Sequence, residues 1–160
     1  MIAKATANIW IVEDNEVFAK HMRRMIDAED DMVCPYHFTC AEDLFDKLQT
    51  TAERPDLLLC DIGLPGRDGL NILSDVRSLL PGLKVLMLTA FDDREIVYRA
   101  ICNGASGYLL KTDEPDEILA GIHAVMDGAS ALSNPIAKII LERWRDYGSS
   151  STTPLPVEPQ

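Results

Sequence analysis

Polar side chains follow four short apolar runs in this chain, and together they could bind and accept a phosphoryl group. The runs end where a different residue type begins: 9–12 before Glu13 and Asp14, 57–60 before Asp61, 85–88 before Thr89, and 108–110 before Lys111. Carboxylates bind hard divalent cations through oxygen, and a carboxylate can attack phosphorus to form an acyl phosphate. A hydroxyl and an ammonium can hold phosphoryl oxygens. These residue types are those of a metal-assisted phosphoryl-transfer site.

The apolar runs predict the strands that would bring these residues together. Continuous apolar runs without alternation are typical of strands buried on both faces of a parallel sheet. In such sheets ligands bind just beyond the carboxyl ends of the strands. We therefore expect three carboxylates, one hydroxyl and one ammonium to meet at one edge.

Asp61 is the candidate phosphoacceptor. Glu13 and Asp14, at the neighbouring strand end, are expected to bind a divalent cation together with Asp61. Mg²⁺ is the expected ion, with Mn²⁺ as its substitute, and the backbone carbonyl of Gly63 would complete the protein ligands. Carboxylates packed together without a cation would raise one or more of their pKa values. The metal would thus also keep Asp61 ionised.

Lys111 is expected to neutralise Asp61 and then to bind a phosphoryl oxygen, because a compact charge on a long stem suits that role. Thr89 would donate to a second phosphoryl oxygen, and the small Ala90 leaves room for the group. Each residue alone has a plainer interpretation as a cap, a turn former or a surface charge. The conjunction at successive strand ends favours the site.

Between the strands the sequence predicts helices. Apolar spacing or capping residues indicate helices over Glu16–Asp27, around 44–48, over 70–80, from Asp92-Asp93 to about 103, and over Pro115–Met126. An edge strand is expected over Met32–Phe38, and the turn formers at 64–69 predict a loop. Five strands alternating with five helices predict an α/β fold, a flavodoxin-like doubly wound parallel sheet of order 2-1-3-4-5.

The C-terminal part is expected to form one more helix. Asn134 can cap it, Pro135 fits its first turn, and an apolar stripe follows at Ile136, Ile139, Ile140 and Trp144. Residues 148–160 have linker composition and are expected to be disordered. The domain boundaries predicted are 1–130 for the main domain, 131–147 for an additional amphipathic linker helix and 148–160 for the linker.

Composition excludes several function classes. The formal net charge of −11 opposes binding to a nucleic-acid backbone. No apolar stretch is long enough to span a bilayer and no signal segment opens the chain. The four cysteines lack metal-ligand spacing, so we interpret them as reduced thiols. The expected location is the cytoplasm, with no membrane partner.

The polar set, with the loop at 64–69 and the block at 107–111, resembles the receiver domain of two-component response regulators. The similarity covers about residues 9–128, and the stretches 104–111 and 132–135 are most similar to NarL/FixJ-type regulators, which have LuxR-type outputs. The resemblance implies that Asp61 accepts a phosphoryl group from a sensor histidine kinase or a phosphotransfer protein. It also implies Mg²⁺ binding by Glu13, Asp14 and the Gly63 carbonyl.

The resemblance further implies that Thr89 and Lys111 hold the phosphoryl group and that Tyr108 is the switch aromatic, which turns inward when the threonine moves. Phosphorylation would then promote a homodimer and control transcription, with DNA bound only through a helix-turn-helix domain that follows the linker. Two positions are specific to this chain. Thr112 follows the lysine where many receivers have a proline in cis linkage, and the bulky Phe91 is expected to shield the phosphoryl group and slow its hydrolysis.

Three other functions would place different requirements on the sequence. A haloacid dehalogenase-type phosphatase would need a second aspartate two residues after Asp61, where this chain has Gly63, so no enzymatic turnover beyond self-phosphotransfer and slow autodephosphorylation is expected. A nucleotide-binding module would need a glycine-rich phosphate motif, which is absent. A phosphorylation-independent receiver-like interaction module stays open, because intact residues do not prove a cognate kinase.

Overall fold

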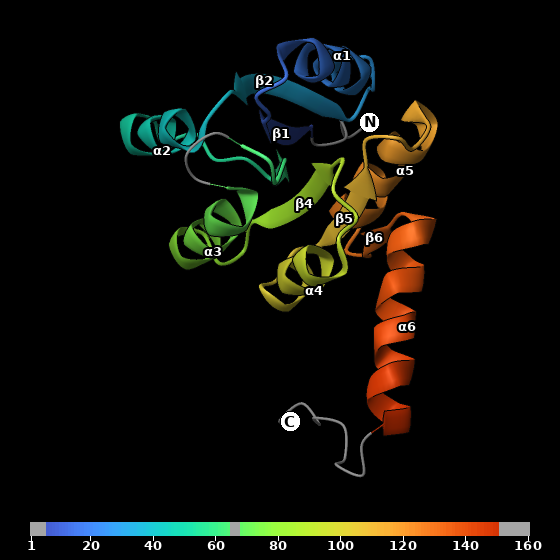
Figure 1. Cartoon of the computed structure of the whole chain (residues 1–160). Coiled ribbons are helices and arrows are strands. Elements are labelled where there is room, and N and C mark those ends of the chain that lie inside the picture. Colours follow the sequence, from blue (N-terminus) through green and yellow to red (C-terminus); the bar gives the residue numbers. More distant parts are fainter. Residues whose placement is uncertain (1–5, 65–67, 151–160) are drawn as a thin grey trace.

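Parallel strands form one sheet at the centre of the domain, and helices cover both of its faces (Figure 1). This computed structural model describes residues 6–64 and 68–150 of the 160-residue chain. The strand order β2-β1-β3-β4-β5-β6 confirms the predicted α/β fold and contains the predicted order 2-1-3-4-5. The strands are β1 (Ala7–Val12), β2 (Met32–Phe38), β3 (Leu57–Cys60), β4 (Lys84–Thr89), β5 (Gly107–Leu110) and β6 (Ala131–Leu132).

The strand count differs from the prediction by one. β6 lies beside β5, with Ala131 opposite Gly107 and Leu132 opposite Tyr108. Two residues are too few to produce a periodic pattern, so no strand is predictable here from local sequence. The pairing forms because the chain returns from α5 (Pro115–Met126) to the sheet edge, where β5 would otherwise leave backbone groups unpaired.

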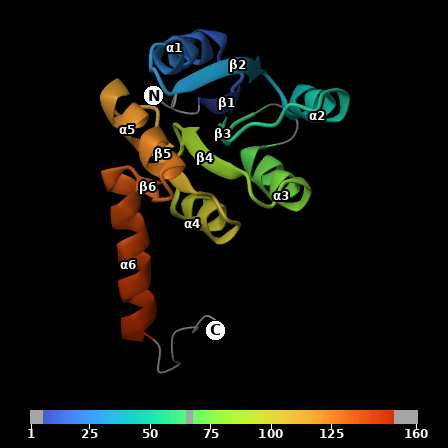
Figure 2. The same cartoon turned by 180° about the vertical axis from the view of Figure 1, so that it is seen from behind.

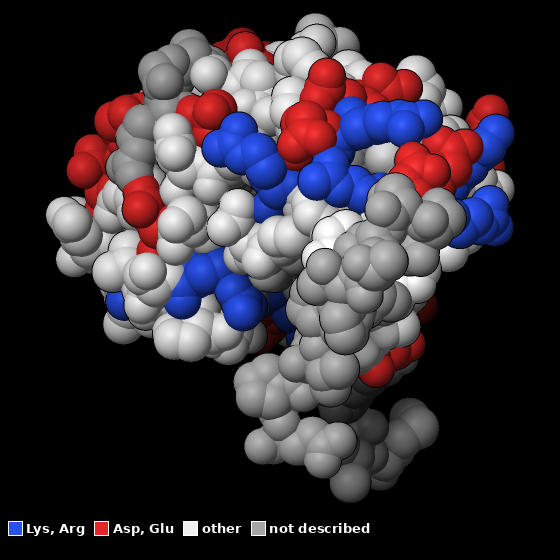
Figure 3. Space-filling view, turned by 60° about the horizontal axis from the view of Figure 1, so that its bottom comes forward, with Lys and Arg blue, Asp and Glu red and all other residues white. Residues whose placement is uncertain are grey.

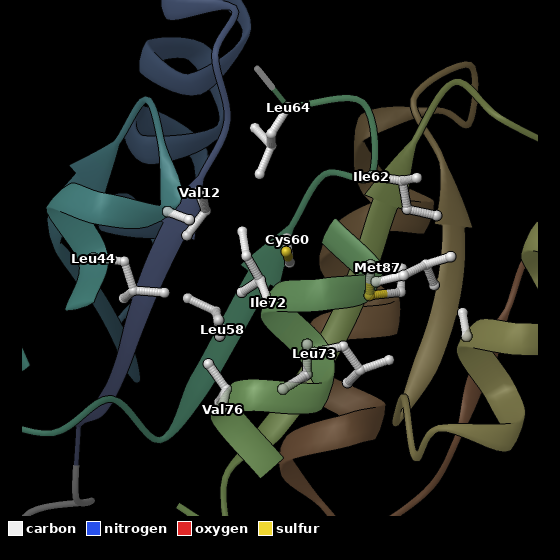
Figure 4. Packing of buried hydrophobic residues seen from close by; sticks show 14 of the residues in the cluster. Val12, Leu44, Leu58, Cys60, Ile62, Leu64, Ile72, Leu73, Val76 and Met87 are labelled. Carbon is white, nitrogen blue, oxygen red and sulfur yellow. The ribbon is translucent and has the colours of Figure 1, made fainter. Parts of the chain in front are cut away.

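The helices divide between the two faces because alternate strand residues point in opposite directions (Figures 1 and 2). Residues such as Ile11, Leu59 and Leu88 pack under α1 and α5, while Val12, Cys60 and Met87 pack under the helices of the other face. The helices are α1 (Glu16–Asp27), α2 (Ala41–Thr50), α3 (Gly69–Leu79), α4 (Arg94–Cys102), α5 (Pro115–Met126) and α6 (Asn134–Ser150). Figure 4 shows the core against α3, where the labelled sheet residues Leu58, Cys60 and Met87 lie beside Ile72, Leu73 and Val76.

The predicted helices agree with the structure within a residue or two wherever a capping residue is present. Asn15 caps α1 by accepting from the backbone N–H of Phe18 at 3.1 Å, and Asp93 caps α4 in the same manner. The predicted loop at 64–69 is shorter than expected, since Gly69 is the first residue of α3. Residues 65–67 of that loop lie outside the described part of the chain.

α6 begins and ends differently from the prediction. The backbone carbonyl of Ser133 accepts from the N–H of Ala137 at 2.9 Å, so Ser133 occupies the cap position and Asn134 is already helical. The helix extends through Ser150, three residues into the predicted linker, and residues 151–160 lie outside the described part. A single glycine such as Gly148 costs a helix about 1 kcal/mol, which does not end it.

The predicted apolar stripe of α6 is buried only at its beginning. Ile136 is fully buried, whereas Trp144 is 59% exposed. Beyond its first turns α6 extends away from the body of the domain (Figures 1 and 2). The face seen from that end carries acidic and basic side chains intermixed rather than a continuous basic patch (Figure 3).

Two further sequence expectations concern membranes and cysteines. Among the helices described, none has both the length and the apolar composition needed to cross a bilayer. All four cysteines are free thiols, and Cys34 and Cys60 are buried. Burial raises the pKa of the Cys34 thiol to about 12, which keeps it protonated and unreactive.

The hydroxyl of Ser133 joins α6 to the sheet, and its loss should destabilise the fold. Ser133 Oγ accepts from the backbone N–H of Leu110 at 2.9 Å and donates to the Asp113 carboxylate. The Ser133→Ala variant leaves a buried N–H unpaired, so its free energy of unfolding should fall by about 1–3 kcal/mol. Urea unfolding measures this, with the exposed Ser130→Ala as the control. Equal values for both variants would contradict the role of the hydroxyl.

Candidate functional site

The carboxyl ends of β1, β3, β4 and β5 meet at one edge of the sheet and bring the predicted site residues together. Glu13 and Asp14 follow β1, and Asp61 follows β3. Carboxylate oxygens of these three residues all lie within 4.8 Å of one another. Thr89 is the last residue of β4, and Lys111 directly follows β5. A surface hollow of about 480 Å³ lies at the opposite edge of the sheet, where β3 and β4 begin. Its lining residues include no comparable cluster of carboxylates.

Backbone hydrogen bonds fix the position of Asp61 and orient its side chain. Its side chain is buried, and its N–H donates to the carbonyl of Val12 at 3.1 Å, which continues the pairing of β3 with β1. One carboxylate oxygen, Oδ1, accepts from the backbone N–H of Ile62 at 2.8 Å. The other oxygen, Oδ2, lies 3.1 Å from the ammonium of Lys111. Oδ2 is therefore the oxygen that faces the other groups of the site.

Gly69 allows α3 to approach the backbone of Asp61. A Cβ at this position would lie 2.1 Å from the Asp61 carbonyl oxygen, closer than atoms can pack. The N–H of Gly69 donates to the carbonyl of Ile62 at 2.9 Å and closes the loop. Any larger residue would push the start of α3 away from the end of β3.

Lys111 provides the positive charge between the buried carboxylates. Its ammonium contacts Glu13 Oε1 and lies 3.1 Å from Asp61 Oδ2, and it sits 4.9 Å from the ring centroid of Phe18. When all groups are ionised, the three carboxylates (−3) and this ammonium (+1) leave a charge of −2. A divalent cation would balance that charge, and carboxylate oxygens are the ligands that Mg²⁺ prefers. The donor set thus fits such an ion.

Burial dominates the electrostatics of Glu13. It raises the pKa of this carboxyl from 4.5 to about 7, although hydrogen bonds from Lys111 and from the N–H of Asn15 offset part of the effect. The nearby charge of Asp61 adds to the increase. For Lys111, burial lowers the pKa, but the contacts with Glu13 and Asp61 outweigh it and the net shift is upward. Lys111 therefore stays charged at neutral pH.

Thr89 and Tyr108 are linked through the loop that leads into α4. Thr89 is fully buried. Its hydroxyl oxygen accepts from the N–H of Phe91 at 3.3 Å, and its backbone carbonyl accepts from the N–H of Lys111 at 2.9 Å. Tyr108 is also fully buried, and its hydroxyl donates to the carbonyl of Phe91 at 2.6 Å. The Lys111–Thr112 peptide bond is trans.

The ring of Phe91 lies over the loop that follows Asp61. A Cβ added to Gly63 would lie 2.6 Å from Phe91 Cε2, so the ring packs directly against the Gly63 backbone. Phe91 is nevertheless 45% exposed, and Ala90 beside it is exposed as well. The ring thus forms a partial cover at the solvent side of the site. A ligand role for the Gly63 carbonyl stays a prediction.

Comparison with known proteins identifies the family. The family model described as "Response regulator receiver domain" matches residues 9–123. The chain belongs to this family. That assignment confirms the resemblance found in the sequence.

The relatives of this receiver domain are response regulators. It is 32% identical over 143 residues to "Uncharacterized transcriptional regulatory protein YxjL" of Bacillus subtilis, covering 89% of this chain and 65% of that protein. It is 33% identical over 146 residues to "Oxygen regulatory protein NreC" of Staphylococcus aureus, covering 90% of this chain and 66% of the relative. The chain thus spans less than two thirds of the length of either protein.

A solved structure supports the same assignment. The crystal structure of a LuxR-family two-component response regulator from Aurantimonas superimposes with a TM-score of 0.81 at 27% identity. The match covers 88% of this receiver domain and 99% of that chain.

Sequence reasoning missed three residues that shape the site of this receiver domain. Asn15 caps α1 and donates to Glu13 Oε2 at 3.0 Å, Phe18 lies under the Lys111 ammonium, and Gly69 permits the approach of α3. Asn15 carried a capping signal, since Asn is favoured before a helix. Phe18 fits the apolar spacing of the helix predicted over Glu16–Asp27, but its contact with Lys111 has no signal in the local sequence.

The raised pKa of Glu13 predicts how stability depends on pH without metal. Between pH 4.5 and about 7 the folded state holds a proton that the unfolded state has released, so stability falls as the pH rises through this window. In EDTA, the unfolding free energy of the wild type should decrease from pH 5 to pH 8 by about 1–3 kcal/mol more than that of Glu13→Gln. Urea unfolding at several pH values measures this, with exposed Glu42→Gln as the control. Parallel curves for the wild type and Glu13→Gln would contradict it.

Proposed function

We propose that this receiver domain accepts a phosphoryl group on Asp61 from a phosphohistidine donor in a reaction that requires Mg²⁺ or Mn²⁺. The observation that carries the proposal is the position of Asp61 Oδ2, 3.1 Å from Lys111 and within the acidic cluster. Oδ2 attacks phosphorus as the P–N bond of the donor breaks, and the imidazole leaves. Asp61 is the acceptor in this reaction, and the protein transforms no other substrate beyond a slow hydrolysis of its own phosphoryl group.

Glu13 and Asp14 would hold the metal ion together with Asp61 and the carbonyl of Gly63. The ion supplies charge neutralisation between the carboxylates and the incoming phosphoryl oxygens. Lys111 would supply further positive charge, because its ammonium already contacts Asp61. Asn15 and Ile62 keep the two buried carboxylates in place through backbone N–H donors, at 3.0 Å and 2.8 Å.

Phosphorylation would change the hydrogen bonds of Thr89. Its hydroxyl donates to a phosphoryl oxygen, and the acyl phosphate adds about −1.5 to −2 charges beside it. Because Thr89 Oγ1 also accepts from the N–H of Phe91, the loop leading into α4 follows its movement. Tyr108 is coupled to the same loop, since its hydroxyl donates to the Phe91 carbonyl. The result is a population shift between two arrangements of β4, α4 and Tyr108.

The resemblance to NarL/FixJ-type regulators extends the proposal to partners. A sensor histidine kinase or phosphotransfer protein would donate the phosphoryl group, the phosphorylated form would dimerise, and the regulated output would be transcription. DNA would be bound through a helix-turn-helix domain rather than through this acidic receiver. The alternative is a receiver-like module that binds partners without phosphorylation. It is disfavoured by the cluster itself, because a pure interaction surface has no need for three carboxylates around a lysine.

Intact mass tests the acceptor role. With Mg²⁺ and acetyl phosphate the wild type should gain one phosphoryl increment, whereas Asp61→Asn and the wild type in EDTA should gain none. The exposed Asp127→Asn is the matched control and should behave as the wild type. A wild-type protein that gains no increment at any Mg²⁺ concentration would refute the proposed function. Sedimentation of the same samples tests dimerisation, which unchanged mass in both states would contradict.

Phe91 should slow the loss of the phosphoryl group by limiting access of water. The Phe91→Ala variant keeps the backbone carbonyl that Tyr108 binds but removes the ring over Gly63. We expect its phosphorylated form to decay several-fold faster, as followed by intact mass after removal of acetyl phosphate. Leu79→Ala, which also truncates an exposed apolar side chain but lies outside the site, serves as the control. Equal decay rates for the wild type and Phe91→Ala would contradict the shielding role.

A further inference from the structure

α6 is attached at its beginning to the strand that leads into Lys111. The N–H of Ser133 donates to the carbonyl of Tyr108 at 3.1 Å, and the Ser133 hydroxyl binds both Leu110 and Asp113. Ile136, one turn further, is fully buried in the core. The first turn of α6 is thus fixed to β5 and moves with it.

The middle of α6 is attached to a different element, the first turn of α4. Arg94 binds Glu142 at 2.8 Å, and Glu95 binds Arg143 at 2.6 Å, so two consecutive residues of each helix pair with opposite signs. The guanidinium of Arg143 also lies 4.0 Å from the ring centroid of Tyr98. We call these contacts between residues 94–98 and 142–143 the α4–α6 clamp.

The clamp lies directly after the loop that phosphorylation is expected to move. Arg94 and Glu95 are the fifth and sixth residues after Thr89, and Phe91, between them and Thr89, is the residue whose N–H contacts the Thr89 hydroxyl. A shift of this loop displaces the start of α4. α6 does not follow automatically, because its own beginning is held by β5.

The clamp is weak enough to open. The side chains of Arg94 and Glu95 are 62% and 71% exposed, and exposed ion pairs are individually weak and sensitive to salt. Over residues 136–140 α6 packs against the core, whereas a hollow of about 350 Å³ lined by Arg94, Ile139 and Tyr147 lies beside the clamp. The second half of α6 extends from the domain (Figure 1). The polar contacts of the clamp therefore contribute to the position of this second half.

We propose that α6 is a lever, anchored on β5 and clamped to the first turn of α4, whose second half is released when Asp61 is phosphorylated. The inference rests on the proposed function, because it requires Asp61 to accept the phosphoryl group. Displacement of α4 relative to β5 separates the paired charges. The direction of the second half of α6 then changes with the state of the site.

Hydrogen exchange over residues 138–147 tests the clamp in the unphosphorylated protein. Glu142→Arg places two positive charges opposite each other and should accelerate exchange in this segment several-fold. The double variant Arg94→Glu/Glu142→Arg restores opposite charges and should return exchange to the wild-type rate. Arg145→Glu, a charge reversal at an exposed position of the same helix, is the control and should leave exchange unchanged. Failure of the double variant to restore protection would overturn the clamp.

The same measurement after treatment with Mg²⁺ and acetyl phosphate tests the release. Exchange over 138–147 should rise in the phosphorylated wild type toward the rate of Glu142→Arg, which should itself accept the phosphoryl group but show no further increase. A normal mass increment with unchanged exchange in the wild type would overturn the lever and leave the proposed function intact. Absence of the increment would overturn both.

Discussion

The charge balance around Lys111 is the constraint on which the functional end of this domain depends. Two buried carboxylates, those of Glu13 and Asp61, follow different strands, and burying carboxylates without a nearby positive charge is costly. The ammonium of Lys111 contacts both, and it reaches them from a third strand. Burial still leaves Glu13 with a raised pKa, so the site is incompletely neutralised. Negative charge that remains uncompensated favours the binding of a metal cation.

The sheet edge makes this balance possible. The carboxyl ends of parallel strands lie at the same edge of a sheet, so the residues that follow β1, β3 and β5 lie close together. Backbone N–H groups of Asn15 and Ile62 then fix the two carboxylates, and Gly69 lets α3 pack close to the loop. A closely packed core lies beneath the site, so changes at Thr89 and Lys111 would be transmitted along the chain.

Two routes lead from the site toward α6. Thr89 contacts the Phe91 backbone, and α4 begins three residues after Phe91, where it pairs with α6. Lys111 follows β5, whose last residue, Leu110, binds Ser133 at the start of α6. α6 therefore contacts the elements behind both residues that would hold a phosphoryl group. The position of a helix that is attached to two elements depends on how those elements move relative to each other, rather than on the movement of either one alone.

The sequence by itself determined the strand order, the helices with strong caps and the set of residues at the strand ends, because these depend on local periodicity and on a general rule for parallel sheets. It did not determine β6, whose two residues carry no pattern, or the full length of α6. The tertiary structure alone decided that Phe18 lies beneath Lys111, that Gly69 must lack a side chain, and that Arg94 and Glu95 meet Glu142 and Arg143. These contacts join residues distant in the chain, and no local pattern encodes which pairs will meet.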